Sequence, residues 1–160
     1  MTLERVVLDR DSRGALSPFI EADREQAVAD LAAANHFSVF ARGGGREEGP
    51  YVLRLSISEG RLIFDIRDRK DAPLTAIGLA LGPFRRLVKD YQMLVDSHIK
   101  AVQEGREARI QAIDMGRRGL HDEGATLMTE RLAGKIEIDF DTARRLFTLV
   151  CVLAQRVAAR

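Results

Sequence analysis

The sequence predicts an α+β fold, in which a small antiparallel sheet carries helices packed on one face. Two stretches that alternate between apolar and polar residues, 52–57 and 62–66, are separated by Ser-Glu-Gly and indicate a β-hairpin. After the Gly-Pro pair at position 82, apolar residues recur every three or four positions, which is typical of amphipathic helices. We therefore expect a single domain over 1–160, mostly β with one helix over 1–81 and mostly helical over 82–160.

The N-terminal part begins with a β-prone stretch, residues 3–8, followed by a helix over 21–35. That helix is expected to keep three charged residues on its outer face: Asp23, Arg24 and Asp30. Residues 42–50, RGGGREEGP, contain three consecutive glycines but lack the spacing and the Lys-Ser/Thr ending of a phosphate-binding P-loop. We interpret this segment as a flexible glycine-rich loop.

A third strand is predicted directly after the hairpin. The polar residues 68–73 are expected to form a turn, and residues 74–81, LTAIGLAL, are apolar throughout, as in a strand buried on both faces. The element order is then β-α-β-β-β, and the N-terminal strand is free to join an edge of the three-stranded meander.

Three or four helices are predicted in the C-terminal half. Residues 83–104 follow the helical period and end at Gly105, and residues 107–132 form either one helix or two that are broken near Gly116 and Gly119. Residues 135–139, KIEID, alternate as in a brief strand. Asp139 or Asp141 is expected to cap the last helix, because a carboxylate there satisfies free backbone N–H groups.

Composition restricts the classes of partner and compartment. Basic and acidic residues balance at a net charge of +1, and aromatic residues make up 6%, so nucleic-acid binding is not favoured. The apolar runs are too short to span a bilayer, and the charged N-terminus does not resemble a signal peptide. The single cysteine, Cys151, lies in an apolar run and is expected to be an inert buried thiol. We expect a cytoplasmic protein.

The densest polar chemistry lies in residues 112–125, AIDMGRRGLHDEGA. Apolar residues at 110, 113, 120 and 127 share one helical face, and Arg117 falls on that same face. A guanidinium on a core-facing stripe needs a carboxylate, a carbonyl or a bound anion, because it does not lose its proton. Local carboxylates are available: Asp114 lies one turn before the Arg117-Arg118 pair, and Asp122 lies four residues after Arg118.

Two interpretations of this stretch remain open. In the first, Arg117, Arg118 and His121 form a site for an anion or a polar ligand together with the neighbouring acids. In the second, the same charges form a self-satisfied salt-bridge network that fixes how two helices cross. A metal site is not predicted, because adjacent helical residues point in different directions and no His or Cys pair has ligand spacing.

Arginine pairs occur three times in the helical half. If these pairs converged, they would form a strong anion site, since arginine binds phosphate or carboxylate through two parallel hydrogen bonds. The alternative is three solvated faces. The candidate ligand-binding residues are Arg85, Arg86, Arg117, Arg118, Arg144 and Arg145.

Three segments carry a resemblance to a known family: GPFRRLVKDY (82–91), AIDMGRRGLHDEGA (112–125) and GKIEIDFDTARRLFTLVCVL (134–153). They resemble an uncharacterised bacterial protein family without an assigned function. The resemblance covers most of the chain and is strongest over 82–153, whereas the glycine-rich loop looks like a variable insert. It implies no activity, no cofactor and no catalytic residues.

Two functions follow as hypotheses. The first is a non-enzymatic binding or interaction module that engages an anionic small molecule or a protein partner through its arginines. The alternative is an enzyme acting on a phosphorylated or carboxylated small molecule, with His121 as the acid/base and Asp114 or Glu123 as the orienting carboxylate. The cofactor, if there is one, is unknown, and a homo-oligomer is possible through the long apolar-striped helix over 83–104.

Overall fold

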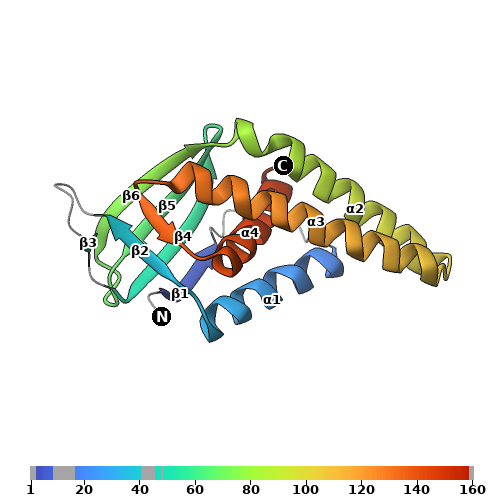
Figure 1. The fold of residues 1–160 in the computed structure, drawn as a ribbon, viewed down its shortest axis with the longest axis horizontal. Coiled ribbons are helices and arrows are strands. Elements are labelled where there is room, and N and C mark those ends of the chain that lie inside the picture. The colour runs from blue at the N-terminus through green and yellow to red at the C-terminus, as the bar shows by residue number, and fades with distance from the viewer. Residues whose placement is uncertain (1–2, 9–16, 41–45, 48, 159–160) are drawn as a thin grey trace.

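The computed structural model describes residues 3–8, 17–40, 46–47 and 49–158, and the side chains of 46–47 and 156–158 lie outside the description. Within these residues the strands lie at one end of the molecule, and a long helical hairpin over residues 85–132 extends toward the other end (Figure 1). The strands are β1 (Leu3–Leu8), β2 (Phe37–Phe40), β3 (Arg46–Glu47), β4 (Tyr51–Ser58), β5 (Arg61–Arg67), β6 (Pro73–Ala80) and β7 (Ile136–Ile138). The helices are α1 (Pro18–Ala33), the short 3₁₀ helix η1 (Gly82–Phe84), α2 (Arg85–Gln103), α3 (Glu107–Leu132) and α4 (Phe140–Ala158).

The predicted α+β class is confirmed, and the main sheet has the order β1-β4-β5-β6. The hairpin pairs Leu55 with Phe64 and Ile57 with Leu62, as the alternating pattern requires. β1 joins the edge of this sheet, but it pairs in parallel with β4, so the sheet is mostly rather than wholly antiparallel. A parallel pair needs a long crossover, and here α1, β2 and β3 lie between its two strands in the sequence.

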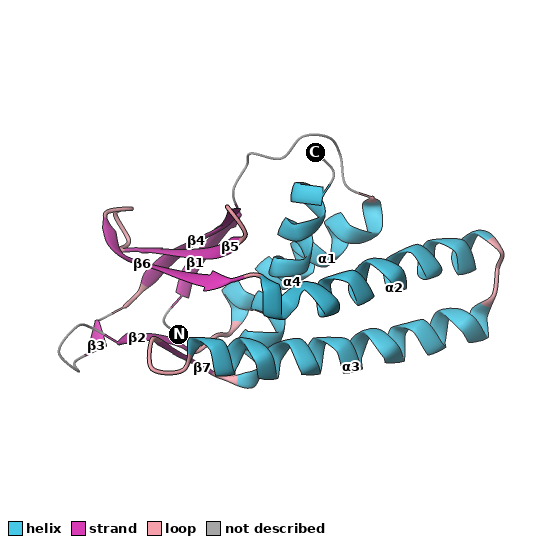
Figure 2. Cartoon of the chain, turned by 90° about the horizontal axis from the view of Figure 1, so that it is seen from above, coloured by secondary structure: helices cyan, strands magenta, loops and turns pink. Residues whose placement is uncertain are grey.

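A second, smaller sheet has the order β3-β2-β7 (Figure 2). The brief strand predicted in KIEID is β7, and β2 was not predicted because FSVF follows directly on the end of the first helix. Phe37 and Val39 of β2 are buried, and the pairing with β7 is antiparallel. Of the glycine-rich segment 42–50, residues 46–47 pair with β2 as β3, and residues 42–45 and 48 lie outside the described residues.

The prediction that the third strand is buried on both faces is wrong. β6 spans Pro73–Ala80 at the edge of the sheet, and of its residues only Leu79 is buried. An uninterrupted apolar run does not establish burial, because much of a protein's accessible surface is apolar. The edge position and the helices on one face of the sheet leave most of the strand in contact with solvent.

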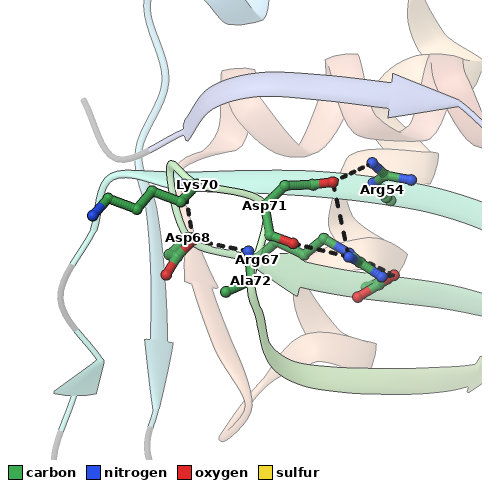
Figure 3. A network of polar contacts seen from close by, with 7 residues as sticks. Arg54, Arg67, Asp68, Lys70, Asp71 and Ala72 are labelled. Atoms are coloured by element: carbon green, nitrogen blue, oxygen red, sulfur yellow. Dashed lines mark hydrogen bonds and ion pairs between the residues drawn. The ribbon is translucent and has the colours of Figure 1, made fainter.

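The turn between β5 and β6 is held by the polar residues that the sequence indicated (Figure 3). The Asp68 carboxylate accepts hydrogen bonds from the backbone N–H groups of Lys70 and Ala72, both at 2.9 Å. Asp71 adopts a left-handed conformation with φ of 68°, and its carboxylate accepts a 2.6 Å hydrogen bond from Arg54 of β4. The aspartates therefore tie this turn both to its own backbone and to the neighbouring strand.

The helix boundaries follow capping chemistry. Ser17 caps α1 by accepting from the Ile20 N–H, and Pro18 takes the first helical position, so the helix begins three residues before the predicted start. Asp139 rather than Asp141 caps α4, through a 2.9 Å hydrogen bond from the Thr142 N–H. α3 is one unbroken helix, which resolves the alternative that the sequence left open.

α4 forms the centre of the core. It packs against α1, α2, α3 and β4, and every residue from Leu146 to Leu153 is buried. A helical segment that is almost entirely apolar, as this one is, is expected to be enclosed on all sides. Cys151 is fully buried here, and burial raises the pKa of its thiol, as expected for an inert cysteine.

Candidate functional site

Arg117 of α3 points toward α1 and not toward a carboxylate of its own helix. Its Nη1 atom donates to both oxygens of Asp23, at 3.1 Å and 3.3 Å, and its guanidinium lies 5.1 Å from the centre of the Phe19 ring. The core-facing stripe therefore does carry a guanidinium, and the carboxylate that neutralises it comes from 94 residues earlier in the chain. The outer-face position predicted for Asp23 is wrong, because its carboxylate accepts hydrogen bonds from Arg117 of α3 and from Tyr91 of α2 and its side chain is only 17% exposed.

Asp23 also joins α1 to α2. The hydroxyl of Tyr91, a fully buried residue, donates a 2.6 Å hydrogen bond to Asp23 Oδ2. Burial, and then the adjacent Asp23 carboxylate, raise the pKa of Tyr91, so its phenol stays protonated and acts as a donor. One carboxylate thus accepts hydrogen bonds from two helices and fixes α1, α2 and α3 relative to one another.

His121 follows Arg117 by one turn on α3. Its ring lies 6.3 Å from the Tyr91 ring in a stacked arrangement and 6.1 Å from the Phe147 ring in an edge-on one. Burial, and then the positive charge of Arg117, lower the pKa of His121 to about 4, so the imidazole is neutral at pH 7. Its Nε2 atom is buried and makes no hydrogen bond with any described residue.

Arg144 and Arg145 complete the site from α4. Arg144 Nε lies 2.9 Å from Asp122 Oδ1, but its N–H does not have hydrogen-bond geometry toward any described acceptor and is buried. Arg145 Nε lies 3.5 Å from Asp30 Oδ2, a loose ion pair. The ion pairs of Arg144 and Arg145 therefore leave guanidinium N–H groups that can still donate hydrogen bonds.

These side chains surround a pocket of about 180 Å³ between α1, α3 and α4, which we call the arginine pocket. Three guanidinium groups and two carboxylates line it, so its formal charge is +1 with His121 neutral. Its walls also include the Thr148 hydroxyl, which donates to the Arg144 backbone carbonyl at 3.1 Å, and the Gln26 amide, which donates one of its N–H groups to Asp30 at 2.9 Å. The lining residues are Asp23, Gln26, Ala27, Asp30, Arg117, His121, Arg144, Arg145 and Thr148.

Other candidate residues lie elsewhere. Arg86 pairs with Asp90 at 3.0 Å and with Glu123 at 2.8 Å, on a different face of α3 from the arginine pocket. Arg85 and Arg118 are exposed and do not line the pocket. Asp114 lies 4.0 Å from His98 and likewise takes no part.

The three arginine pairs thus converge only in part, through one residue of the middle pair and both residues of the last pair. Asp23 and Asp30, which sequence reasoning left on a solvated face, supply the carboxylates of the site. The described residues contain no group of three or more His, Cys, Asp or Glu side chains that could hold a metal ion. No helix in the described ranges is long and apolar enough to cross a bilayer.

Comparison with known proteins places the sequence in a family. Residues 1–156 match the uncharacterised protein family UPF0262. The chain belongs to UPF0262. The UPF0262 protein of Granulibacter bethesdensis is 66% identical over 159 residues, which cover 97% of this chain and 90% of the relative. The UPF0262 protein of Acidiphilium cryptum is 60% identical over 154 residues, covering 96% and 93%.

A UPF0262 protein of Maricaulis maris is 49% identical over 155 residues, covering 97% of this chain and 94% of the relative. The family resemblance carried by the three sequence segments is therefore confirmed. No solved structure matches the chain. The names of these UPF0262 relatives state no activity, so the function has to be argued from the arginine pocket itself.

Proposed function

We propose that this UPF0262 protein is a cytoplasmic, non-enzymatic binding module whose arginine pocket holds a small anion. The observation that carries the proposal is a pair of buried nitrogen atoms beside this pocket. His121 Nε2 has no hydrogen-bond partner among the described residues, and the Nε–H of Arg144 is not aligned with Asp122 Oδ1, although the two atoms lie 2.9 Å apart. A buried polar group without a partner costs about 1–3 kcal/mol, and a bound ligand would remove that cost.

The charges and the volume restrict the ligand. A pocket of about 180 Å³ accepts inorganic phosphate or a small mono- or dicarboxylate rather than a nucleotide. Within the part of the chain that the structure describes, the ion pair of Arg145 is the 3.5 Å contact with Asp30, a loose one, so its guanidinium can turn toward a ligand at little cost. Arginine binds such anions through two parallel N–H donors, which a neutral ligand would leave unmatched.

The proposal is tested by calorimetric titration of phosphate, malonate and acetate into the wild-type protein and its variants. Arg144→Met and Arg145→Met are each expected to weaken binding about tenfold or more, because each removes one charge-assisted contact. Arg118→Met is the matched control: it removes an exposed arginine of α3 that does not line the pocket, and it should leave binding unchanged. Equal losses in the Arg118 and Arg145 variants would show only non-specific charge attraction and refute the site.

Arg117→Met separates ligand binding from the salt-bridge network. If the network only fixes helix crossing, this variant loses stability, because Asp23, whose side chain is 17% exposed, loses its charged partner and keeps the neutral Tyr91 hydroxyl as a donor. If Arg117 also binds the ligand, the variant stays folded and loses affinity. A ligand at 100 times its Kd adds about 2.7 kcal/mol, or about 5–10 °C in Tm for a protein of this size, so melting curves with and without phosphate distinguish the two results.

An enzyme acting on a phosphorylated or carboxylated small molecule is the second candidate. The favouring observation is that His121 lines the pocket and is unprotonated at pH 7, since its pKa is lowered to about 4, although a group with that pKa is a weak base. Asp114 and Glu123 do not line the pocket, which leaves Asp23 and Asp30 as the carboxylates of such a site. Phosphorus NMR of a panel of phosphate esters tests it: turnover that His121→Gln abolishes without loss of binding would favour the enzyme, and binding without turnover would favour the module.

A further inference from the structure

A groove runs between α2 and α3 on a face of α3 distinct from the arginine pocket. Two adjoining hollows of about 680 and 460 Å³ share Gly119 and Glu123 and together form this groove, which we call the α2–α3 groove. At 100° per residue, Gly119 points about 160° away from Arg117 around the helix. The lining residues are Pro83, Arg86, Leu87, Asp90, Met93, Leu94, Ser97, Gly116, Gly119, Leu120, Asp122, Glu123, Thr126, Leu127 and Glu130.

The two glycines in this groove are not needed for packing within the chain. A Cβ atom at Gly119 would meet nothing within 4 Å, and one at Gly116 would meet only the Leu94 side chain, at an ordinary 3.7 Å. Each glycine nevertheless costs an exposed helix about 1 kcal/mol relative to alanine. Their effect on the surface is to leave the floor of the groove open, so that another backbone can approach α3 closely.

Apolar side chains flank this open floor. Met93 is 58% exposed on the α2 side, and Met115, four residues before Gly119 on the same ridge of α3, is 72% exposed. Methionine adapts its shape to a partner, and exposed methionines beside an apolar floor are typical of surfaces that bind amphipathic helices.

The rim of the groove is acidic. Four carboxylates and one guanidinium line it, a formal net charge of −3. Arg86 pairs with both Asp90 and Glu123, and Asp122 pairs with Arg144 of α4. When the charge of Arg144 is counted as well, the rim still has an excess of negative charge. A partner that fills the groove therefore has to bring basic residues beside its apolar ones.

We infer that the α2–α3 groove is a docking surface for a basic amphipathic helix of another protein. From Gly116 to Glu130 the groove follows α3 for about 21 Å, which matches roughly fourteen helical residues. Such a helix would lay its apolar stripe over Gly116 and Gly119, between Met93 and Met115, and direct lysines or arginines to the acidic rim. An extended peptide fits less well, because two helices offer it no strand edge to pair with.

The inference is tested with two synthetic sixteen-residue peptides that share a leucine stripe at helical spacing and carry lysine or glutamate at the other positions. Fluorescence anisotropy is expected to show at least tenfold tighter binding of the lysine peptide to the wild-type protein. Gly119→Met, whose Cβ atom would meet nothing within 4 Å and whose longer side chain fills the floor, is expected to weaken this binding at least tenfold. Glu130→Lys is expected to weaken it through the charge of the rim.

Gln111→Met is the matched control, because it places the same side chain at an exposed position of α3 outside the groove, and it should bind as the wild type does. The inference is overturned if the lysine peptide binds no better than the glutamate peptide, if neither binds at millimolar concentration, or if Gly119→Met binds normally. A concentration-dependent dimer that Gly119→Met dissociates in sedimentation would also overturn it, since the occupant would then be a second copy of the chain.

Discussion

Two glycines of α3 lie in opposite environments, and replacing each with alanine is expected to change stability in opposite directions. A Cβ atom added to Gly124 would lie 2.5 Å from Cδ1 of Phe147 and overlap two further ring carbons, and Phe147 is fully buried. A Cβ atom added to Gly119 would meet nothing within 4 Å. Gly124 thus permits the close approach of α3 to α4, whereas Gly119 serves no contact inside the chain.

The magnitudes follow from two opposing terms. Gly→Ala in a helix gains about 1 kcal/mol, and forcing a methyl group into a packed core costs about 1–3 kcal/mol or more. Gly119→Ala gains helix preference without any steric overlap, so it should raise Tm by about 2–4 °C. In Gly124→Ala we expect the overlap to outweigh the gain, because it involves ring carbons of a fully buried side chain, and a net loss of about 2 kcal/mol should lower Tm by about 4–8 °C.

Urea unfolding followed by circular dichroism measures both changes on the same helix with the same substitution. Each variant serves as the control of the other for the intrinsic helix preference. A Gly124→Ala protein as stable as the wild type, or a Gly119→Ala protein that is less stable, would refute the reasoning from close approach.

Two further predictions concern the arginine pocket. The pKa of His121 is about 4 in the folded protein, below the unfolded value of 6.5, so the folded state is favoured by the neutral imidazole. This contribution to the free energy of unfolding is fully present above pH 6.5 and is lost as the pH falls through 4. Urea unfolding at pH 4 and at pH 7 should show a loss of about 3 kcal/mol at the lower pH that is absent from His121→Gln. Tyr91→Phe removes the 2.6 Å hydrogen bond to Asp23 and should cost about 1–2 kcal/mol by urea unfolding, while the exposed Arg118→Met should cost almost nothing.

Local signals in the sequence were enough to predict much of the fold. The hairpin follows from alternation, and two helix ends lie beside glycines that adopt positive φ, Gly105 at 67° and Gly134 at 81°. The burial of β6 was mispredicted because hydrophobicity describes the residues of a strand and not its place in the sheet, and that place depends on which strands pair with it.

The sequence predicted the arginine of the candidate site but not the carboxylate that pairs with it. The position of Arg117 on an apolar stripe indicates that a counter-charge must be present, but not where in the chain it comes from. Asp23 is on the polar side of α1 by periodicity, and it becomes partly buried because the side chains of Arg117 and Tyr91 reach it from α3 and α2. Partners that are 94 residues apart leave no local pattern, so one sequence indicates the need for such a pair without identifying its second member.

The same argument explains why α3 carries so many polar residues and glycines in a short stretch. Three of its faces meet different surroundings: Gly124 meets α4, Arg117 meets α1, and Gly119 meets the open groove. Each surrounding favours a different residue type, so polar residues and glycines interrupt the apolar stripe of the helix. Because the arginine pocket and the α2–α3 groove share no lining residue, variants of Arg145 and of Gly119 should affect anion binding and peptide binding independently. A variant in the groove that also abolished phosphate binding would mean that the two surfaces are coupled through α3.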